Sequence, residues 1–151
     1  MEKLSSIDEI LDFAIGNEEE SATFYSDLAQ QTVDQAMSRL FESFAGQELG
    51  HKAKLQAIKD GVIPAPARKQ VMDLKIAEYV VDVKPGLNMK YQDALILAMK
   101  REKATFKMYN DLATMTEDEA LREAFLTLAQ EEARHKLRIE IEYDEHVLTE
   151  N

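Results

Sequence analysis

Two short segments of this sequence place a carboxylate and an imidazole at a spacing that suits metal binding. Each has the form Glu-x-x-His, and three residues along a helix bring both side chains onto one face. Another glutamate precedes each segment by the same interval. Four carboxylates and two imidazoles could supply the ligands of two divalent metal ions. The six candidate ligands are Glu18, Glu48, His51, Glu102, Glu132 and His135.

The rest of the chain favours helices as the elements that position these residues. Of its 151 residues, 45% are hydrophobic and 31% charged, which predicts a single globular domain rather than a disordered chain. Its three prolines all lie between positions 64 and 85, so each flank is free of the residue that breaks helices. We therefore expect two helical hairpins, about 6–60 and 89–147, joined by a long crossover over about 61–88.

Short capping motifs indicate where the helices of each hairpin begin. Thr32-x-x-Gln35 and Thr116-x-x-Glu119 have the capping-box form, and Ser6-x-x-Glu9 gives the same signal for the first helix. The predicted helices are 6–31, 34–60, 89–114 and 117–147. The crossover is too long for a tight turn, so it must return along the bundle and start the third helix near the end of the first. Within it, the stretch 74–81 is a candidate to pack across the bundle or against a neighbouring subunit.

The two hairpins are repeats of one another. A shift of 84 positions aligns residues 14–55 with residues 98–139 without a gap, and about a third of the pairs are identical. Two amphipathic hairpins of similar composition could agree by chance. Agreement without gaps at the rarer residue types Tyr, Phe and His makes chance the weaker explanation.

Charged residues occupy the positions where a bundle core should be apolar. Steps of four and three along each predicted helix trace an inward-facing seam, which is apolar at both ends and polar in the middle. Glu18 and Glu48 are each fifteen residues from position 33, and Glu102 and Glu132 are each fifteen from position 117. Because residues equidistant from a turn lie at one level of a hairpin, the four carboxylates should meet in one layer.

Four buried carboxylates require compensating positive charge. Removing each from water costs several kcal/mol, and no Lys or Arg occupies these seam positions. Two divalent cations would balance the four charges and leave both imidazoles neutral. Oxygen ligands with two histidines suit iron or manganese, and zinc is also compatible. A polar core satisfied without metal is the weaker alternative.

Several residues near the seam have two interpretations. Tyr25 and Tyr109 are either core aromatics or donors to a carboxylate ligand. Glycines at 46 and 50 suggest either close helix approach or an access path. Glutamates at 19, 20 and 131 are rotated off the seam and are expected to face water. His146 lies among acidic residues near the C-terminus and is expected to be solvated.

The chain resembles the ferritin-like superfamily, and specifically its rubrerythrin branch, over nearly its whole length. The resemblance lies in the stretches AIGNEEESATFY, LFESFAGQELGHKAKL, AMKREKATFKMY and FLTLAQEEARHKLRIE. It implies an antiparallel four-helix bundle in which Glu48 and Glu132 bridge two iron ions. One further glutamate and one histidine would then bind each ion, Glu18 and Glu102 being the terminal carboxylates. Such proteins react reduced di-iron with oxygen or peroxide, so Glu48, Glu132, Tyr25 and Tyr109 are the candidate catalytic residues.

The resemblance leaves the activity open between related functions. Rubrerythrin peroxidases usually add a rubredoxin domain with Cys-x-x-Cys motifs, but this chain has no Cys. They also carry a glutamate where Thr105 stands here, so the ligand set is closer to that of bacterioferritin. Cage-forming ferritins add a fifth helix, for which no counterpart follows position 147. We expect an oxidoreductase that needs an external electron donor. A ferroxidase or iron-handling protein, and a metal-stabilised bundle without catalysis, are the alternatives.

Charge and hydropathy narrow the partners and the compartment. A formal net charge of −11 argues against nucleic-acid binding, which calls for a basic face. The start, MEKLSSIDEI, lacks the apolar stretch of a signal peptide, and the longest wholly apolar run, 94–99, is too short to span a bilayer. We therefore expect a cytoplasmic protein without membrane contact. A homodimer is expected because the superfamily commonly pairs.

Overall fold

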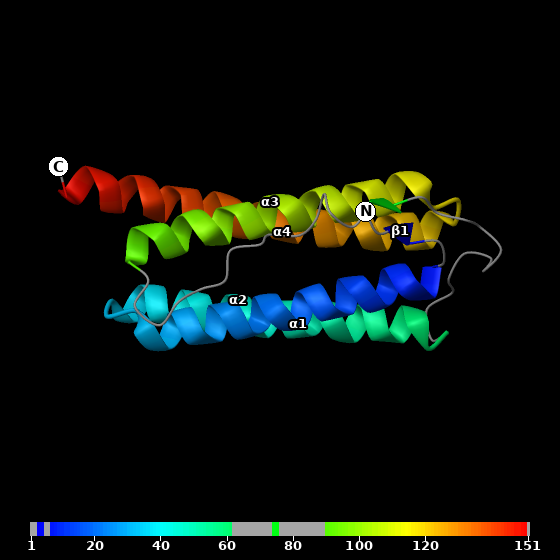
Figure 1. Ribbon diagram of the computed structural model, residues 1–151, viewed down its shortest axis with the longest axis horizontal. Helices are drawn as coiled ribbons and strands as arrows, with labels where there is room; N and C mark the ends of the chain where they lie inside the picture. Colours follow the sequence, from blue (N-terminus) through cyan, green and yellow to red (C-terminus); the bar gives the residue numbers. More distant parts are fainter. Residues whose placement is uncertain (1–2, 5–6, 62–73, 76–89, 151) are drawn as a thin grey trace.

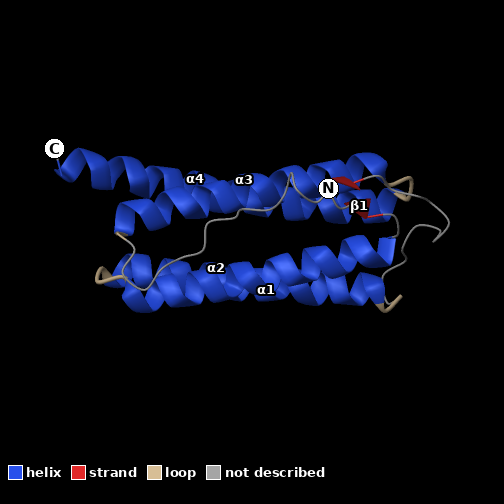
Figure 2. Cartoon of the chain, viewed as in Figure 1, coloured by secondary structure: helices blue, strands red, loops and turns tan. Residues whose placement is uncertain are grey.

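The computed structural model describes residues 3–4, 7–61, 74–75 and 90–150, and most of these residues lie in four long helices. The helices run nearly side by side along the long axis of the molecule (Figure 1, Figure 2). Their bounds differ from the sequence prediction by three residues at most. The helices are α1 (Ile7–Gln31), α2 (Gln35–Lys59), α3 (Tyr91–Met115) and α4 (Glu119–Glu150).

The helices form two antiparallel hairpins, which pack as a four-helix bundle. One hairpin is α1 with α2 and the other is α3 with α4 (Figure 1). The third helix begins at the end of the bundle where α1 ends, as the length of the crossover predicts. The predicted all-α, antiparallel four-helix class is confirmed.

The capping residues differ from those that the sequence motifs predict. The carboxylate of Asp34 accepts a hydrogen bond of 2.8 Å from the backbone N–H of Met37, and Asp118 accepts one of 2.8 Å from that of Leu121. The predicted caps, Thr32 and Thr116, instead donate their hydroxyls back to carbonyls of the preceding helix. Aspartate two residues further on therefore supplies the cap. The motif at Ser6 lies outside the described residues.

A two-residue β-ladder accompanies the helices. Strand β1 (Lys3–Leu4) pairs antiparallel with β2 (Leu74–Lys75). The start of the stretch that was predicted to pack across the bundle or a neighbouring subunit therefore pairs with the N-terminal strand. The remainder of that stretch, 76–81, lies outside the described residues.

The hydrophobic core is divided into two clusters, one toward each end of the bundle. The first includes Leu11, Leu55 and Phe125, and the second includes Phe41 and Leu95, all with no exposed surface. The predicted seams supply part of both clusters, and their described apolar members are buried except for a half-buried Tyr91. Off-seam residues such as Ile10 and Phe24 supply the rest. Burial of these apolar side chains supplies the main driving force for folding. The polar members of the seams fill the layer between the two clusters.

Candidate metal centre

The four seam glutamates and both seam histidines are buried in this layer. The carboxylates are at most 2% exposed, and His51 and His135 are 5% and 3% exposed. Hairpin geometry explains why they meet, since each helix contributes its glutamate at the same level. All six residues predicted as ligands are therefore close together inside the bundle.

The six side chains form two overlapping groups of four. In each group, one nitrogen or oxygen atom from every member lies within 4.8 Å of the others. Glu48 and Glu132 belong to both groups, so they lie where ligands that bridge two metal ions would lie. The first group is Glu18, Glu48, His51 and Glu132; the second group is Glu48, Glu102, Glu132 and His135.

Both imidazoles direct Nδ1 toward the carboxylates. His51 Nδ1 lies 2.9 Å from Glu132 Oε1 and 3.3 Å from Glu18 Oε2. His135 Nδ1 lies 3.4 Å from Glu48 Oε1 and 3.5 Å from Glu102 Oε1. In a metal-bound centre, Nδ1 would therefore be the ligand atom of each histidine.

Buried atoms without hydrogen bonds test whether these residues fit a metal pair. Among the described residues, one carboxylate oxygen of each of the four glutamates is buried without a hydrogen bond, and so is Nδ1 of His135. Buried polar atoms are normally paired, and leaving one unpaired is costly. Five such atoms in one layer fit ligands directed at cations. The donor set, carboxylate oxygens with imidazole nitrogens, suits iron and related divalent metals.

The electrostatics of the layer reflect its burial. Burial, reinforced by neighbouring carboxylates, raises the pKa of Glu48 and of Glu132 well above the usual value. Burial alone would raise the pKa of Glu102, but the neighbouring Glu132, His135 and Tyr25 lower it. Burial would lower the pKa of His51, but Glu18 and the carboxylates around it raise the pKa to about 9. The raised pKa values of Glu48, Glu132 and His51 favour protonated forms, whose protons a metal pair would displace.

The two buried tyrosines donate hydrogen bonds to carboxylates across the bundle. Tyr109 donates to Glu18 Oε1 at 2.6 Å, and Tyr25 donates to Glu102 Oε1. Each tyrosine therefore contacts the glutamate of the other hairpin and not the one seven residues earlier on its own seam. Burial and the nearby carboxylates raise both phenol pKa values well above 10, so both hydroxyls keep their protons.

The outer edge of each histidine contacts a residue outside the six predicted ligands. Nε2 of His135 lies 2.6 Å from Gln47 Oε1, and Nε2 of His51 contacts Glu131 Oε2. The prediction that Glu131 faces water is therefore wrong, because its half-exposed side chain reaches back to His51. The signal was present in the sequence, since Gln47 and Glu131 are equivalent positions of the 84-residue repeat and each precedes a histidine by one turn.

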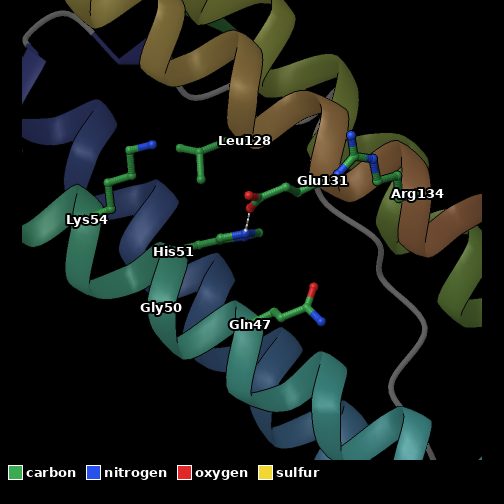
Figure 3. A pocket seen from close by; sticks show the side chains of 7 residues that line it. All are labelled: Gln47, Gly50, His51, Lys54, Leu128, Glu131 and Arg134. Carbon is green, nitrogen blue, oxygen red and sulfur yellow. Dashed lines mark hydrogen bonds and ion pairs between the residues drawn. The ribbon is translucent and has the colours of Figure 1, made fainter.

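A pocket of about 420 Å³ opens on this outer edge of His51. It lies between α2 and α4, and Figure 3 shows His51 and Glu131 reaching toward each other across it. Gly50 lines the pocket, and an added Cβ at Gly50 or at Gly46 would meet no atom within 4 Å. The alternative of close helix approach at these glycines is therefore wrong, whereas an access path beside Gly50 fits the pocket.

The remaining off-seam residues follow the prediction in part. Glu19 and Glu20 are exposed as expected. His146 is half-buried, and its ring packs edge-on against Tyr91 with centroids 5.1 Å apart. The expectation of a solvated His146 is wrong, because Tyr91 from the start of α3 lies beside the last turns of α4.

Comparison with known proteins agrees with this geometry. The family model described as Rubrerythrin matches residues 9–143, which include all six candidate ligands. The chain belongs to the rubrerythrin family. The resemblance that the sequence motifs indicate is thereby confirmed, and the buried Glu/His groups of this family member suggest a di-iron type of site.

Two solved structures extend the comparison. A protein from Thermotoga maritima described as a ferritin-like diiron-carboxylate protein is 18% identical, with a TM-score of 0.83. The match covers 97% of this chain and 99% of that one, and it confirms the fold of this rubrerythrin. A hypothetical protein from Pyrococcus furiosus is 26% identical, with a TM-score of 0.69 over 91% of this chain and 87% of that one. The curated proteins searched contain no match.

None of the helices in the described part of the chain combines the length and the apolar character needed to cross a bilayer.

The pKa shifts predict how pH affects the stability of the metal-free protein. For a group whose folded pKa exceeds its unfolded value, the stabilisation is complete below the unfolded pKa and is lost as pH rises through the folded value. His51 follows this rule, because its pKa rises from 6.5 in the unfolded chain to about 9 in the folded protein. Glu48 and Glu132 follow it as well, because their folded pKa values are also raised. The pKa of Glu102 is lowered, so its contribution to stability is lost only as the pH falls below about 4.5. We therefore expect the urea midpoint to fall between pH 6.5 and 9 after chelation. A midpoint that rises over this window would contradict the electrostatic interpretation.

Proposed function

We propose that this member of the rubrerythrin family binds two iron ions between its six Glu and His ligands and uses them to reduce peroxide or oxygen. The observation that carries the proposal is that the two ligand groups share Glu48 and Glu132, the arrangement expected of bridging carboxylates. The bound metal pair would polarise the oxygens of the substrate and supply two electrons. Because the described residues carry no redox group of their own, an external donor must restore the reduced state.

The protein's own residues would hold the centre in place and keep it dry. Glu48 and Glu132, which belong to both groups, would supply half of the balancing negative charge, and Glu18 and Glu102 would supply the other half. The apolar clusters on either side exclude water, which strengthens the electrostatic interactions within the layer. The pocket beside Gly50 would admit a molecule as small as peroxide to the edge of His51.

The tyrosines would act on the terminal carboxylates. Tyr25 donates to Oε1 of Glu102 and Tyr109 donates to Oε1 of Glu18, and this contact would fix the orientation of each carboxylate. Their raised pKa values favour neutral phenols that remain hydrogen-bond donors. We propose that Tyr25 and Tyr109 position the ligands during the reaction.

Stopped-flow oxidation of the ferrous protein tests the proposed reaction. Protein loaded anaerobically with two ferrous ions per chain is mixed with peroxide or with oxygen at equal concentration, and the ferric absorbance is followed. We expect both oxidants to react and peroxide to react faster. Oxidation by peroxide at the rate of oxidation by oxygen, or more slowly, would contradict the peroxidase form of the proposal.

A ferroxidase within an iron-handling system is the second candidate, and one observation favours it. Thr105 is buried and accepts a hydrogen bond of 2.9 Å from Asn17, so this seam position supplies no additional carboxylate to the layer. The ligands are therefore balanced, with one terminal glutamate in each group. Light scattering after stepwise iron addition separates the candidates, because a particle that stays small and forms no mineral excludes independent iron storage.

A further inference from the structure

The surroundings of the two ligand groups are related by the 84-residue repeat, but several equivalent positions differ in charge, and two of these pairs contact residues of the polar layer. The equivalent pairs are Gln47 with Glu131 and Asn17 with Arg101. Within each pair the two side chains make the same kind of contact on opposite sides of the centre. One member of each pair is neutral and the other carries a charge.

The first pair acts on the histidines. Gln47 presents an amide oxygen to Nε2 of His135 at 2.6 Å, whereas Glu131 presents a carboxylate oxygen to Nε2 of His51. When Nδ1 binds a metal ion, Nε2 keeps the proton and donates it to this partner. A carboxylate acceptor makes the imidazole a stronger ligand than an amide does. The first group thereby gains electron density at its histidine, and the second does not.

The second pair acts beside the terminal glutamates. Asn17, which precedes Glu18, donates to the hydroxyl of Thr105, whereas Arg101, which precedes Glu102, donates to the hydroxyl of Ser21 at 3.1 Å. Nε of Arg101 is buried without a hydrogen bond, and its guanidinium lies 5.6 Å from the ring centre of Phe24. A half-buried cation next to Glu102 reduces the negative potential at the second group. Both asymmetries therefore favour a cation in the first group.

Other charges around Glu131 do not cancel this difference. Lys54 and Arg134 line the same pocket (Figure 3), but no ion pair joins either of them to Glu131 in the described part of the chain. Arg134 is exposed, so water and salt screen its charge. The carboxylate of Glu131 contacts the imidazole directly.

We infer that the two metal positions are inequivalent: the first group binds a divalent cation more tightly than the second, and Glu131 is the positioning residue responsible. The inference rests on the proposed two-metal centre and adds an order of filling to it. Replacing a partner of this kind typically changes metal affinity about 10- to 100-fold. With one equivalent of metal, a difference of that size should place roughly 75–90% of the ions in the first group and the rest in the second. When the two ions differ in oxidation state, the same asymmetry favours the more highly charged ion in the first group.

Crystals that contain one equivalent of Co²⁺ test the order of filling without any catalytic turnover. Anomalous diffraction at the cobalt edge measures the occupancy of each position separately. In the wild-type protein we expect most of the cobalt in the first group. Equal occupancies, or preference for the second group, would overturn the inference.

Exchange of the two partners separates this effect from a purely structural one. In the double variant Q47E/E131Q the carboxylate faces His135 and the amide faces His51, while the composition of the layer is unchanged. We expect the preference to move toward the second group. The single variant E131Q should bring the two occupancies closer together and serves if the double variant does not fold. The control E123Q removes one exposed carboxylate from the same helix and should preserve the wild-type preference.

The outcomes also distinguish this inference from the proposed function. If two equivalents of Co²⁺ leave the layer empty in the wild-type protein, the two-metal centre itself is wrong. If two equivalents fill both positions but one equivalent divides evenly, only the inequivalence is wrong. Unchanged occupancies in both Q47E/E131Q and E131Q would remove the role of Glu131.

Discussion

Replacing Glu48 by Gln is expected to reduce the metal content of the protein from two ions per chain to one weakly bound ion or none. Glu48 belongs to both ligand groups, so this substitution removes a charged ligand from each position at once. Glu132→Gln should have the same effect. Glu18 belongs only to the first group, and Glu18→Gln should leave one ion in the second group. Titration with Fe²⁺ under anaerobic conditions measures the number of ions and their affinities.

Two controls make this result specific. Glu42→Gln removes an exposed carboxylate from the same helix and should leave two ions bound. Metal-free Glu48→Gln should remain folded, because an uncharged Gln resembles the protonated carboxyl group that burial favours at Glu48 in the absence of metal. Two tightly bound ions in Glu48→Gln, or equal losses in Glu48→Gln and Glu18→Gln, would contradict the assignment of Glu48 as a shared ligand.

Removal of the metal is expected to cause the largest change in stability. Without cations the layer holds four carboxylates that are at most 2% exposed, whereas bound cations stabilise only the folded form. One site at a free-ion concentration a thousand times its Kd stabilises the fold by about 4 kcal/mol. For a chain of this size that corresponds to roughly 8–16 °C in Tm. Calorimetry of the chelated and the Fe²⁺-loaded protein, both kept anaerobic, measures the difference.

The same experiment examines the alternative of a bundle whose metal ions serve only its stability. A large rise in Tm without reaction of the ferrous protein toward peroxide or oxygen would support that alternative. Glu48→Gln should show little of the rise, since it lacks one of the shared ligands. Identical melting of the chelated and the loaded wild-type protein would exclude any linkage between metal binding and folding.

Much of this centre could be predicted from the sequence because its constraints are periodic. A seam of period between three and four places Phe41, Glu48 and Leu55 on one helix face, and all three are buried. Burial of a charge among apolar neighbours is rare without compensation, so register alone indicated a cation site. The repeat and the symmetry of each hairpin about its turn then placed the four carboxylates in one layer.

The hydrogen-bond partners that a side chain finds on another helix could not be predicted from periodicity. Tyr25 lies two turns from Glu18 on α1, but its hydroxyl donates to Glu102 on α3, a partner that register does not predict. Register defines which face a side chain occupies, whereas the opposite helix supplies the partner. The caps show a similar limit, because Thr32 and Asp34 both suit a cap and local backbone geometry selects Asp34.

The partners of the histidines illustrate a signal that the repeat carries outside the seams. Glu131 lies off the seam because its helical angle differs from that of Glu132. A long carboxylate at the edge of a helix can nevertheless reach across to an imidazole on a neighbouring helix, as it does with His51. Repeat positions that differ in charge, such as Gln47 and Glu131, are therefore informative about how two similar sites differ.

Anomalous diffraction at the iron edge tests the central claim most directly, using crystals of protein purified without added metal and then loaded anaerobically with Fe²⁺. The predicted result is two iron peaks in the polar layer, each in contact with Glu48 and Glu132. One peak should be completed by Glu18 and His51 and the other by Glu102 and His135. A layer without iron, or iron bound only elsewhere on the chain, would contradict the two-metal centre.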